Sequence, residues 1–412
     1  MPSVSVQIDS IAAGGDGVGR ADGLVIFVPR TAPGDIVTAH ISGRGHFARG
    51  ALRNVVTPSP ARVDPPCPHY TRDRCGGCQV QHMSYDAQLA SKRLIIRDSL
   101  HRIGKRTVEP PPIERSPEEW RYRTKLTLSM RRRGARWIAG LHPYDDPTDV
   151  FALADCPITD RRVVATWREV MNAEAHFPDT RELRGSARIT SGGPTFVMSG
   201  GRSWAARDQF SAAVPSVSAL WWEPDGEGHG QRRKLYDRRS DQSPSASFAQ
   251  VNAEVALLLR SFVVERTMAH RPQTVIDAYA GAGHTAIALS EEGVAVMAIE
   301  LDADASAWSA RRLAGSSRAV QGRVEDALPT CLPADVVIVN PPRAGLDARV
   351  TEILEAHAAT TRRVIYISCN PATLARDLAR MPRYRIDSLR AFDMFPQTAH
   401  VETVCELAAD GA

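Results

Sequence analysis

The feature that most constrains the fold is a regular alternation of short apolar runs and helical stretches in the C-terminal part of the chain. The apolar runs have the length of buried strands and comprise Val275–Asp277, Val294–Ile299, Arg318–Gln321, Asp335–Val339 and Val364–Ile367. Helical patterns lie at Asn252–Glu265, Thr285–Glu292, Ala303–Ala314, Ala348–Ala359 and Ala372–Arg380. This alternation predicts a doubly wound, mostly parallel sheet, whose ligands bind at the carboxyl ends of the strands.

The rest of the chain is patterned differently. At 412 residues the chain is long enough for more than one core. Apolar and polar positions alternate around glycine turns near the N-terminus, which is typical of a small β-barrel. The glycine-rich segment Ala13–Arg20 is expected to be a turn. Residues Pro58–Pro66 form a proline-rich linker, and helices are expected at Tyr85–Ile103 and Asp160–Ala175.

These patterns predict an α/β multidomain protein. The expected domains are a β-barrel at 1–57, a central α+β domain at 58–245 and a Rossmann-like domain at 246–412. Residues 223–247 are polar and charged, so we expect an exposed loop there.

Composition limits the classes of function. Hydrophobic residues make up 43% of the chain, no apolar run approaches the length of a membrane span, and the N-terminus shows no secretory signal pattern. We therefore expect a soluble, cytoplasmic protein without a membrane partner, and a monomer by default. The net charge is only +4, but four of the 51 basic residues are Lys and the remainder are Arg. Clusters such as Arg131–Arg133 suit phosphate contacts, although genomic base composition also favours Arg over Lys.

A glycine-rich turn follows the first apolar run. Asp277–Gly283 allows close backbone approach to a ligand, and the amides of the following helix start are available as donors. Glu300 ends the next run, where a ribose diol would be bound. NAD and S-adenosylmethionine both fit this pattern, and a plain structural turn is the alternative. Because the third glycine of the dinucleotide pattern is missing, S-adenosylmethionine is favoured.

Two polar segments follow the fourth and fifth apolar runs. Asn340-Pro341-Pro342-Arg343 forms a rigid corner that can direct a polar group at a substrate, although an ordinary strand-ending turn gives the same pattern. Ser368-Cys369-Asn370-Pro371 places Cys369 just before an expected helix start, where free amides and the helix dipole favour a thiolate. A small core cysteine is the alternative, but the neighbouring cofactor turn favours a nucleophile.

Four cysteines form a separate group: Cys67, Cys75, Cys78 and Cys156. In a cytoplasmic chain this spacing indicates a metal site before disulfides. Four thiolates suit either zinc or a [4Fe-4S] cluster, and spacing alone leaves both open.

Five segments taken in order resemble a known family. They are Phe248–Asn252, Asp277–Gly283, Pro341–Leu346, Ser368–Asp377 and Asp393–Glu402. This order is similar to that of the RNA uracil-C5 methyltransferases, which make 5-methyluridine in tRNA or ribosomal RNA. The resemblance covers the whole chain, because the N-terminal barrel resembles a TRAM domain, an OB-like RNA-binding module. It implies an S-adenosylmethionine-dependent enzyme whose partner is tRNA or rRNA.

The resemblance also implies roles for individual residues. Cys369 would add as a thiolate to carbon 6 of uracil, which makes carbon 5 nucleophilic. Glu402 would then remove the carbon-5 proton. The substrate-binding residues would be Phe248, Gln250 and Arg343, which surround a base turned out of its stack.

For the cofactor and the metal, the implied sets are larger. The implied cofactor-binding residues are Gln250, Tyr279, Gly281, Gly283, His284, Glu300, Arg323 and Asn340. The resemblance favours a [4Fe-4S] cluster over zinc, because Gly76-Gly77 and Pro157 match the family around its cluster.

Two positions depart from the family. His284 stands where the family often has Asn, and Asn340 where it usually has Asp. Since Asn before two prolines is frequent in enzymes that methylate exocyclic amines, an amine or cytosine methyltransferase is one competing hypothesis. A non-catalytic RNA-binding or redox-sensing homologue is another.

Overall fold

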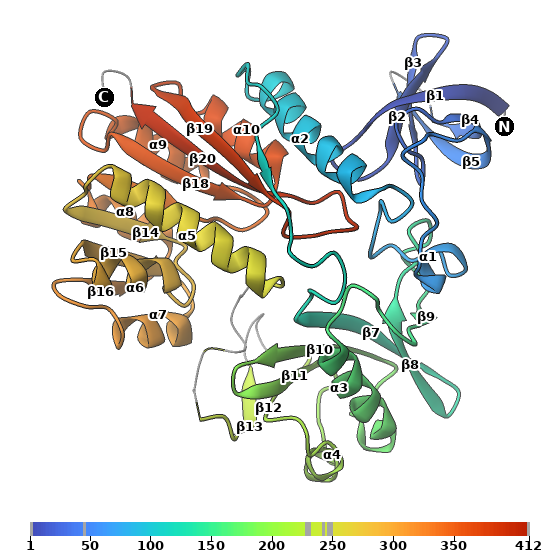
Figure 1. Cartoon of the computed structure of the whole chain (residues 1–412). Coiled ribbons are helices and arrows are strands. Elements are labelled where there is room, and N and C mark those ends of the chain that lie inside the picture. The colour runs from blue at the N-terminus through green and yellow to red at the C-terminus, as the bar shows by residue number, and fades with distance from the viewer. Residues whose placement is uncertain (1–2, 44–46, 227–231, 241–243, 245–249, 410–412) are drawn as a thin grey trace. The chain divides into compact units, whose positions relative to one another are not determined.

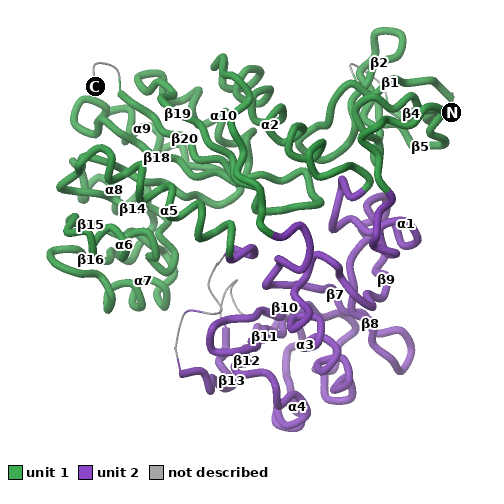
Figure 2. The backbone as a smooth tube through the Cα atoms, viewed as in Figure 1, with its two compact units in different colours: residues 1–63, 82–117, 254–412 green, residues 64–81, 118–253 purple. Residues whose placement is uncertain are grey.

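The computed structural model describes residues 3–43, 47–226, 232–240, 244 and 250–409 (Figure 1). Contacts divide the chain into two compact units (Figure 2). Unit 1 comprises residues 1–63, 82–117 and 254–412, and unit 2 comprises residues 64–81 and 118–253. Residues 82–117 cluster with unit 1, although the sequence assigns them to the central domain. Within the described residues, no helix combines the length and the apolar character needed to cross a membrane.

A closed five-stranded barrel opens unit 1, with strand order β1-β2-β3-β5-β4. Its strands are β1 (Ser3–Ile11), β2 (Gly17–Ala21), β3 (Leu24–Val28), β4 (Ile36–Ser42) and β5 (Phe47–Thr57). The alternating apolar side chains face inward, and Val6, Ile26 and Val28 are fully buried. The barrel that the period-two pattern predicts is therefore present.

The expected turn at Ala13–Arg20 is present at residues 13–15, whereas its second half belongs to strand β2, which begins at Gly17. Gly17 and Gly19 pair with Ile11 and Ile8 in the barrel. A Cβ atom on Gly17 would lie 2.0 Å from Thr31 Oγ1, and one on Gly19 would lie 2.1 Å from the carbonyl oxygen of Gln7. The strand has glycine at these two positions because the neighbouring atoms leave no room for a side chain.

A seven-stranded sheet forms the centre of unit 2, in the order β13-β12-β11-β10-β7-β8-β9. Its strands are β7 (Lys125–Arg133), β8 (Arg136–Leu141), β9 (Phe151–Ala152), β10 (Glu182–Thr190), β11 (Gly193–Ser199), β12 (Ala219–Glu223) and β13 (Arg233–Asp237). The accompanying helices are α1 (Pro68–Thr71), α3 (Arg161–Asn172), the short 3-10 helix Glu174–His176 and α4 (Arg207–Ala213). Strand β13 lies within the expected loop at 223–247, part of which falls outside the described residues.

An eight-stranded sheet forms the rest of unit 1, in the order β16-β15-β14-β17-β18-β20-β19-β6. Its strands are β6 (Ile113–Glu114), β14 (Thr274–Ala278), β15 (Ala295–Glu300), β16 (Arg318–Gln321), β17 (Val336–Val339), β18 (Arg363–Ser368), β19 (Tyr384–Phe392) and β20 (Glu402–Ala409). The five strands β14 to β18 are parallel, as predicted, and β20 is antiparallel to both of its neighbours.

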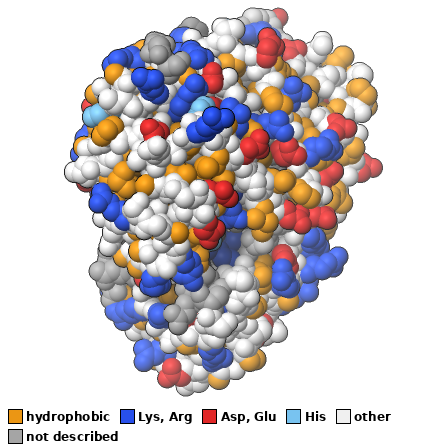
Figure 3. Space-filling view, turned by 60° about the vertical axis from the view of Figure 1, so that its left-hand side comes forward, with side chains coloured by type: hydrophobic (Ala, Val, Ile, Leu, Met, Phe, Trp, Pro, Cys, Tyr) orange, Lys and Arg blue, Asp and Glu red, His pale blue; other side chains and the backbone are white. Residues whose placement is uncertain are grey.

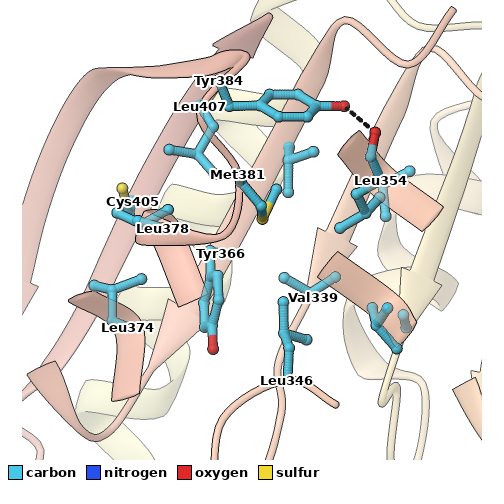
Figure 4. Close-up of a cluster of buried hydrophobic side chains, with 14 of the residues drawn as sticks. Val339, Leu346, Leu354, Tyr366, Leu374, Leu378, Met381, Tyr384, Cys405 and Leu407 are labelled. Carbon is cyan, nitrogen blue, oxygen red and sulfur yellow. Dashed lines mark hydrogen bonds between the residues drawn. The ribbon is translucent and has the colours of Figure 1, made fainter. Parts of the chain in front are cut away.

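Helices cover both faces of this sheet. They are α2 (Tyr85–Arg102), α5 (Ala253–Ala269), α6 (His284–Glu291), α7 (Ala303–Ala310), α8 (Val324–Cys331), α9 (Ala348–Ala356) and α10 (Pro371–Ala379). One buried cluster joins the sheet to α2, α8, α9 and α10, and includes Leu354, Tyr366 and Leu374 (Figure 4). A second buried cluster joins the opposite face to α5 and α6. The carboxyl ends of the five parallel strands therefore all lie at the same edge of the sheet.

The charged surface is mixed. On the face that Figure 3 shows, Lys and Arg side chains occur in separate groups among acidic and apolar ones. This distribution agrees with a net charge of only +4.

Candidate active site

Strand register brings Cys369 and Glu402 together. Because β20 runs antiparallel to β18, the start of β20 lies beside the end of β18, and Ser368 pairs with Thr403. Cys369 follows β18 directly and Glu402 begins β20. The two residues that the sequence proposes as nucleophile and base therefore lie at the same edge, although 32 positions separate them in the chain.

Cys369 is partly exposed, whereas the other six cysteines are buried. Burial raises the pKa of the Cys369 thiol, and the Glu402 carboxylate raises it further. The Arg343 side chain hydrogen-bonds to the thiol, and its positive charge opposes the rise. Burial and Glu402 thus favour the thiol and Arg343 favours the thiolate, and the activation of Cys369 stays a prediction.

The cap of α10 is formed by the residue after Cys369. Asn370, rather than Cys369, is the N-cap residue, and its side-chain oxygen accepts the Ala372 amide at 3.1 Å. The first free amide of the helix is therefore bonded to Asn370.

Glu402 is deeply buried, with 3% of its surface exposed. Burial raises the pKa of this carboxyl group to about 7, while the charge of Arg343 acts in the opposite direction. Arg343 therefore interacts with both residues. We refer to Cys369, Glu402 and Arg343 as the strand-end triad.

The glycine-rich turn after β14 has an unusual backbone. Tyr279 has a φ of 61°, in the left-handed region that non-glycine residues rarely adopt. Gly281 has a φ of 57°, and a Cβ atom added there would meet nothing within 4 Å. In contrast, a Cβ atom on Gly283 would lie 2.2 Å from Ser309 Oγ. Open space thus lies next to Gly281, whereas Gly283 is required for packing.

Glu300 holds this turn against the end of β15. Its carboxylate accepts the Gly281 amide at 2.7 Å and the Asp302 amide at 2.7 Å. The Asn340 amide at the end of β17 donates to the Ala278 carbonyl at 3.1 Å. Tyr279, Gly281, Gly283, Glu300 and Asn340 therefore belong to neighbouring strand ends.

Asp277 is a candidate that the sequence analysis did not assign a role. Its carboxyl group is buried, which raises its pKa to about 7. Among the described residues, its Oδ2 atom has no hydrogen-bond partner. An acidic residue at the end of an otherwise apolar strand is the signal that could have identified it, because such a group is costly to bury without a ligand.

The remaining predicted cofactor residues are peripheral or cannot be placed at the site. The ring of His284, the first residue of α6, packs edge-on against Trp308 with centroids 5.4 Å apart. Arg323 is exposed, and its guanidinium lies 3.5 Å from the Glu325 carboxylate. Gln250 belongs to unit 2, so its cofactor role stays a prediction. Phe248 lies outside the described residues.

The four cysteines of the predicted metal site all lie in unit 2 and are buried. Burial raises the pKa of the Cys78 thiol, and Cys156, Cys75 and Cys67 contribute to the rise, which places the four thiols within electrostatic range. Among the described residues, however, no three His, Cys, Asp or Glu side chains are placed to hold a metal ion. Side-chain geometry therefore does not support the predicted metal site.

Comparison with known proteins identifies the family. Over 430 residues, covering 98% of this chain and 97% of the relative, the chain is 31% identical to an uncharacterized RNA methyltransferase of Protochlamydia amoebophila. It is 33% identical over 449 residues to one of Gloeobacter violaceus, with 98% and 96% covered. A family model described as tRNA (Uracil-5-)-methyltransferase matches residues 317–409. The chain belongs to the tRNA (uracil-5-)-methyltransferase family.

The part that the family model matches contains the whole strand-end triad. As a member of the tRNA (uracil-5-)-methyltransferase family, the chain is an RNA methyltransferase. The solved tRNA (uracil-54, C5)-methyltransferase of Pyrococcus abyssi, in complex with S-adenosyl-L-homocysteine, has a similar fold. The TM-score is 0.70, with 98% of this chain and 100% of that chain covered at 22% identity. This likeness confirms the predicted α/β methyltransferase fold.

Proposed function

We propose that this protein transfers a methyl group from S-adenosylmethionine to carbon 5 of a uridine in tRNA or ribosomal RNA. The observation that carries the proposal is the strand-end triad. A partly exposed thiol, a buried carboxyl group and a guanidinium that interacts with both lie at the strand edge where ligands of this fold bind.

The triad can carry out each step on the uracil ring. The Cys369 thiolate forms a bond to carbon 6, which breaks the carbon 5–carbon 6 double bond and leaves an enolate. Carbon 5 would then form a bond to the methyl group of the donor, whose methyl–sulfur bond would break so that S-adenosylhomocysteine leaves. Glu402 accepts the carbon-5 proton, the double bond forms again, and the carbon 6–sulfur bond breaks to return the thiolate. The raised pKa of Glu402 suits it to accept a proton near neutral pH.

Three features support a methyl-donor site beside the triad. Gly281 borders open space, the Glu300 carboxylate lies at the same turn, and Asp277 has an unpartnered buried oxygen among the described residues. When bound, S-adenosylmethionine supplies an electrophilic methyl group. In this proposal Tyr279, Gly281, Glu300 and Asn340 contact the donor directly, while Gly283 shapes the turn.

Other predicted contacts extend the proposal. His284 and Arg323 are proposed at the rim of the donor site, where both side chains are exposed. Gln250 and Phe248 are proposed to line the pocket of the flipped base, together with Arg343. The five-stranded barrel is proposed to be a TRAM-like module that contacts RNA, which its closed OB-like strand arrangement supports.

For the four buried cysteines we retain a [4Fe-4S] cluster as the proposal, with zinc as the alternative. The proposal rests on four buried thiols that lie in one unit and within electrostatic range of one another.

Methyl transfer can be measured directly. Purified protein is incubated with labelled S-adenosylmethionine and with unmodified tRNA or ribosomal RNA transcripts, and the product nucleosides are separated by mass spectrometry. We expect 5-methyluridine with the wild type and none with Cys369→Ala. A methylated amine or 5-methylcytidine instead would support the competing hypothesis based on Asn340. No methylation of any transcript would contradict the proposed activity.

A further inference from the structure

A fully buried carboxylate lies behind the triad. Asp377, on α10, has no exposed surface, and each of its carboxylate oxygens accepts two hydrogen bonds. Its Oδ2 atom accepts the Tyr366 hydroxyl at 2.7 Å and the Leu346 amide at 2.8 Å. Its Oδ1 atom accepts the Arg376 Nε and Nη2 atoms at 2.9 and 2.7 Å. Tyr366 and Leu346 belong to the buried cluster drawn in Figure 4.

This carboxylate is bonded to the loop that carries Arg343. Arg376, oriented by Asp377, donates to the Ala344 carbonyl at 2.8 Å and to the Leu346 carbonyl at 3.4 Å. Together with the Leu346 amide, these bonds connect Asp377 to both sides of Gly345.

Close packing leaves the loop little freedom. Gly345 has a φ of 80°, and its amide closes a turn onto the Pro342 carbonyl at 2.8 Å. A Cβ atom on Gly345 would lie 2.5 Å from both Arg376 Nη2 and Asp377 Oδ2. The backbone of Gly345 therefore packs directly against the Arg376–Asp377 ion pair, and only glycine permits this close approach.

The start of α10 fixes the other end of the loop. The Arg343 carbonyl accepts the Asn370 side-chain amide at 3.3 Å and the Thr373 hydroxyl at 3.4 Å. Asn370 is also the cap residue next to Cys369. The loop and the cap that follows the nucleophile are thus parts of one hydrogen-bonded assembly.

We propose that Asp377 is a positioning residue, which acts through Arg376 and Leu346 to hold the Arg343 guanidinium beside the Cys369 thiol and the Glu402 carboxylate. The inference rests on the proposed function and extends it. Arg343 and Glu402 are the charged groups that act on the thiol, from the loop after β17 and from β20. Displacement of the loop would remove the cation and leave the carboxylate, so the thiolate would form at higher pH.

The test is the pH dependence of iodoacetamide labelling at Cys369. Because the other six cysteines are buried, peptide mass spectrometry can follow this one thiol. Arg343→Gln should raise the midpoint of labelling by about one pH unit. Asp377→Asn and Arg376→Gln should raise it in the same direction by less. Arg380→Gln is the matched control, since Arg380 lies 3.7 Å from the same Asp377 oxygen and should leave the midpoint unchanged.

Thermal unfolding identifies any variant that fails to fold. If Asp377→Asn does not fold, the Arg376→Gln variant decides, because its side chain is partly exposed. A wild-type midpoint in folded Arg376→Gln and Asp377→Asn proteins, or in Arg343→Gln, would overturn the proposal. Labelling requires neither RNA nor methyl donor, so its outcome is separate from any failure to detect methyl transfer.

Discussion

At the scale of single residues, Glu402 controls the pH dependence of the proposed reaction. Its raised pKa of about 7 means that the carboxyl group is largely protonated in mildly acidic solution. Only the carboxylate accepts a proton, so release of the carbon-5 proton should slow as pH falls below about 7. Tritium release from RNA labelled at carbon 5 measures this step.

The Glu402→Gln variant provides the control for that measurement. It should release no tritium at any pH, because the amide cannot accept the proton. A wild-type release rate that stays constant as pH passes through 7 would contradict the assignment of Glu402 as the base.

The two glycines of the donor turn should respond differently to alanine. Gly281→Ala should lower the free energy of unfolding by only about 1 to 2 kcal/mol, because its backbone is left-handed but the space around it is open. The added methyl group would, however, enter the proposed donor site. Gly283→Ala should unfold at a lower temperature, because its Cβ atom would meet Ser309. Thermal unfolding and calorimetric titration with S-adenosylhomocysteine measure both effects. Wild-type affinity in Gly281→Ala would place the donor elsewhere.

At the scale of elements, helix α2 is locked to the segment that leads into β20. Lys92 and Asp393 are both essentially inaccessible to solvent, and the Lys92 ammonium lies 2.5 Å from the Asp393 carboxylate. The ammonium also donates to the Phe395 carbonyl at 3.0 Å. This buried ion pair fixes the chain a few residues before Glu402.

Loss of either partner should be strongly destabilising. Lys92→Met and Asp393→Leu should each lower the free energy of unfolding. For Lys92→Met the loss should be roughly 3 to 5 kcal/mol, because the buried Asp393 carboxylate is left without a compensating charge. The double variant should lose much less than the sum. Asp86→Asn, on the exposed end of the same helix, should cost no more than about 1 kcal/mol. Urea unfolding measures all four proteins, and additive losses would show that the pair is not coupled.

The sequence predicts the alternating parallel strands and helices better than the elements and residues that depend on tertiary contacts. Parallel strands β14 to β18 follow from short runs between helices, because the inner strands β14, β17 and β18 are buried on both faces. The antiparallel strands β19 and β20 were not predicted, since only their tertiary pairing, of β20 with β18 and of β19 with β20, reveals them. The β2 glycines and Asp377 depend on neighbours that are distant in sequence, such as Thr31 and Leu346. Close approach of this kind leaves no local pattern.

The candidate site was predictable to a similar degree. Cys369, Glu402, Glu300 and the glycine turn were named from motifs, and strand register places them at one edge. The upward shift in the pKa of Cys369 was not predictable, because burial and the Glu402 carboxylate cause it.

At the scale of the whole molecule, the four buried cysteines come from both segments of unit 2, three from residues 64–81 and one from residues 118–253. If they hold a [4Fe-4S] cluster, anaerobically purified protein should be brown and contain iron and sulfide in equal amounts. Cys156→Ser should lose the colour and unfold at a lower temperature, because metal binding stabilises the folded state. Colourless wild-type protein that contains zinc would contradict the iron-sulfur proposal.

The central claim is covalent catalysis by Cys369 on uracil. Its most direct measurement is denaturing electrophoresis of Glu402→Gln protein after incubation with target RNA and S-adenosylmethionine. Without the base, the methylated ring cannot lose its carbon-5 proton, so the Glu402→Gln protein should form a protein–RNA adduct that resists denaturation. The double variant that also carries Cys369→Ala should form no adduct. An adduct that persists without Cys369, or none on RNA that the wild type methylates, would contradict the account.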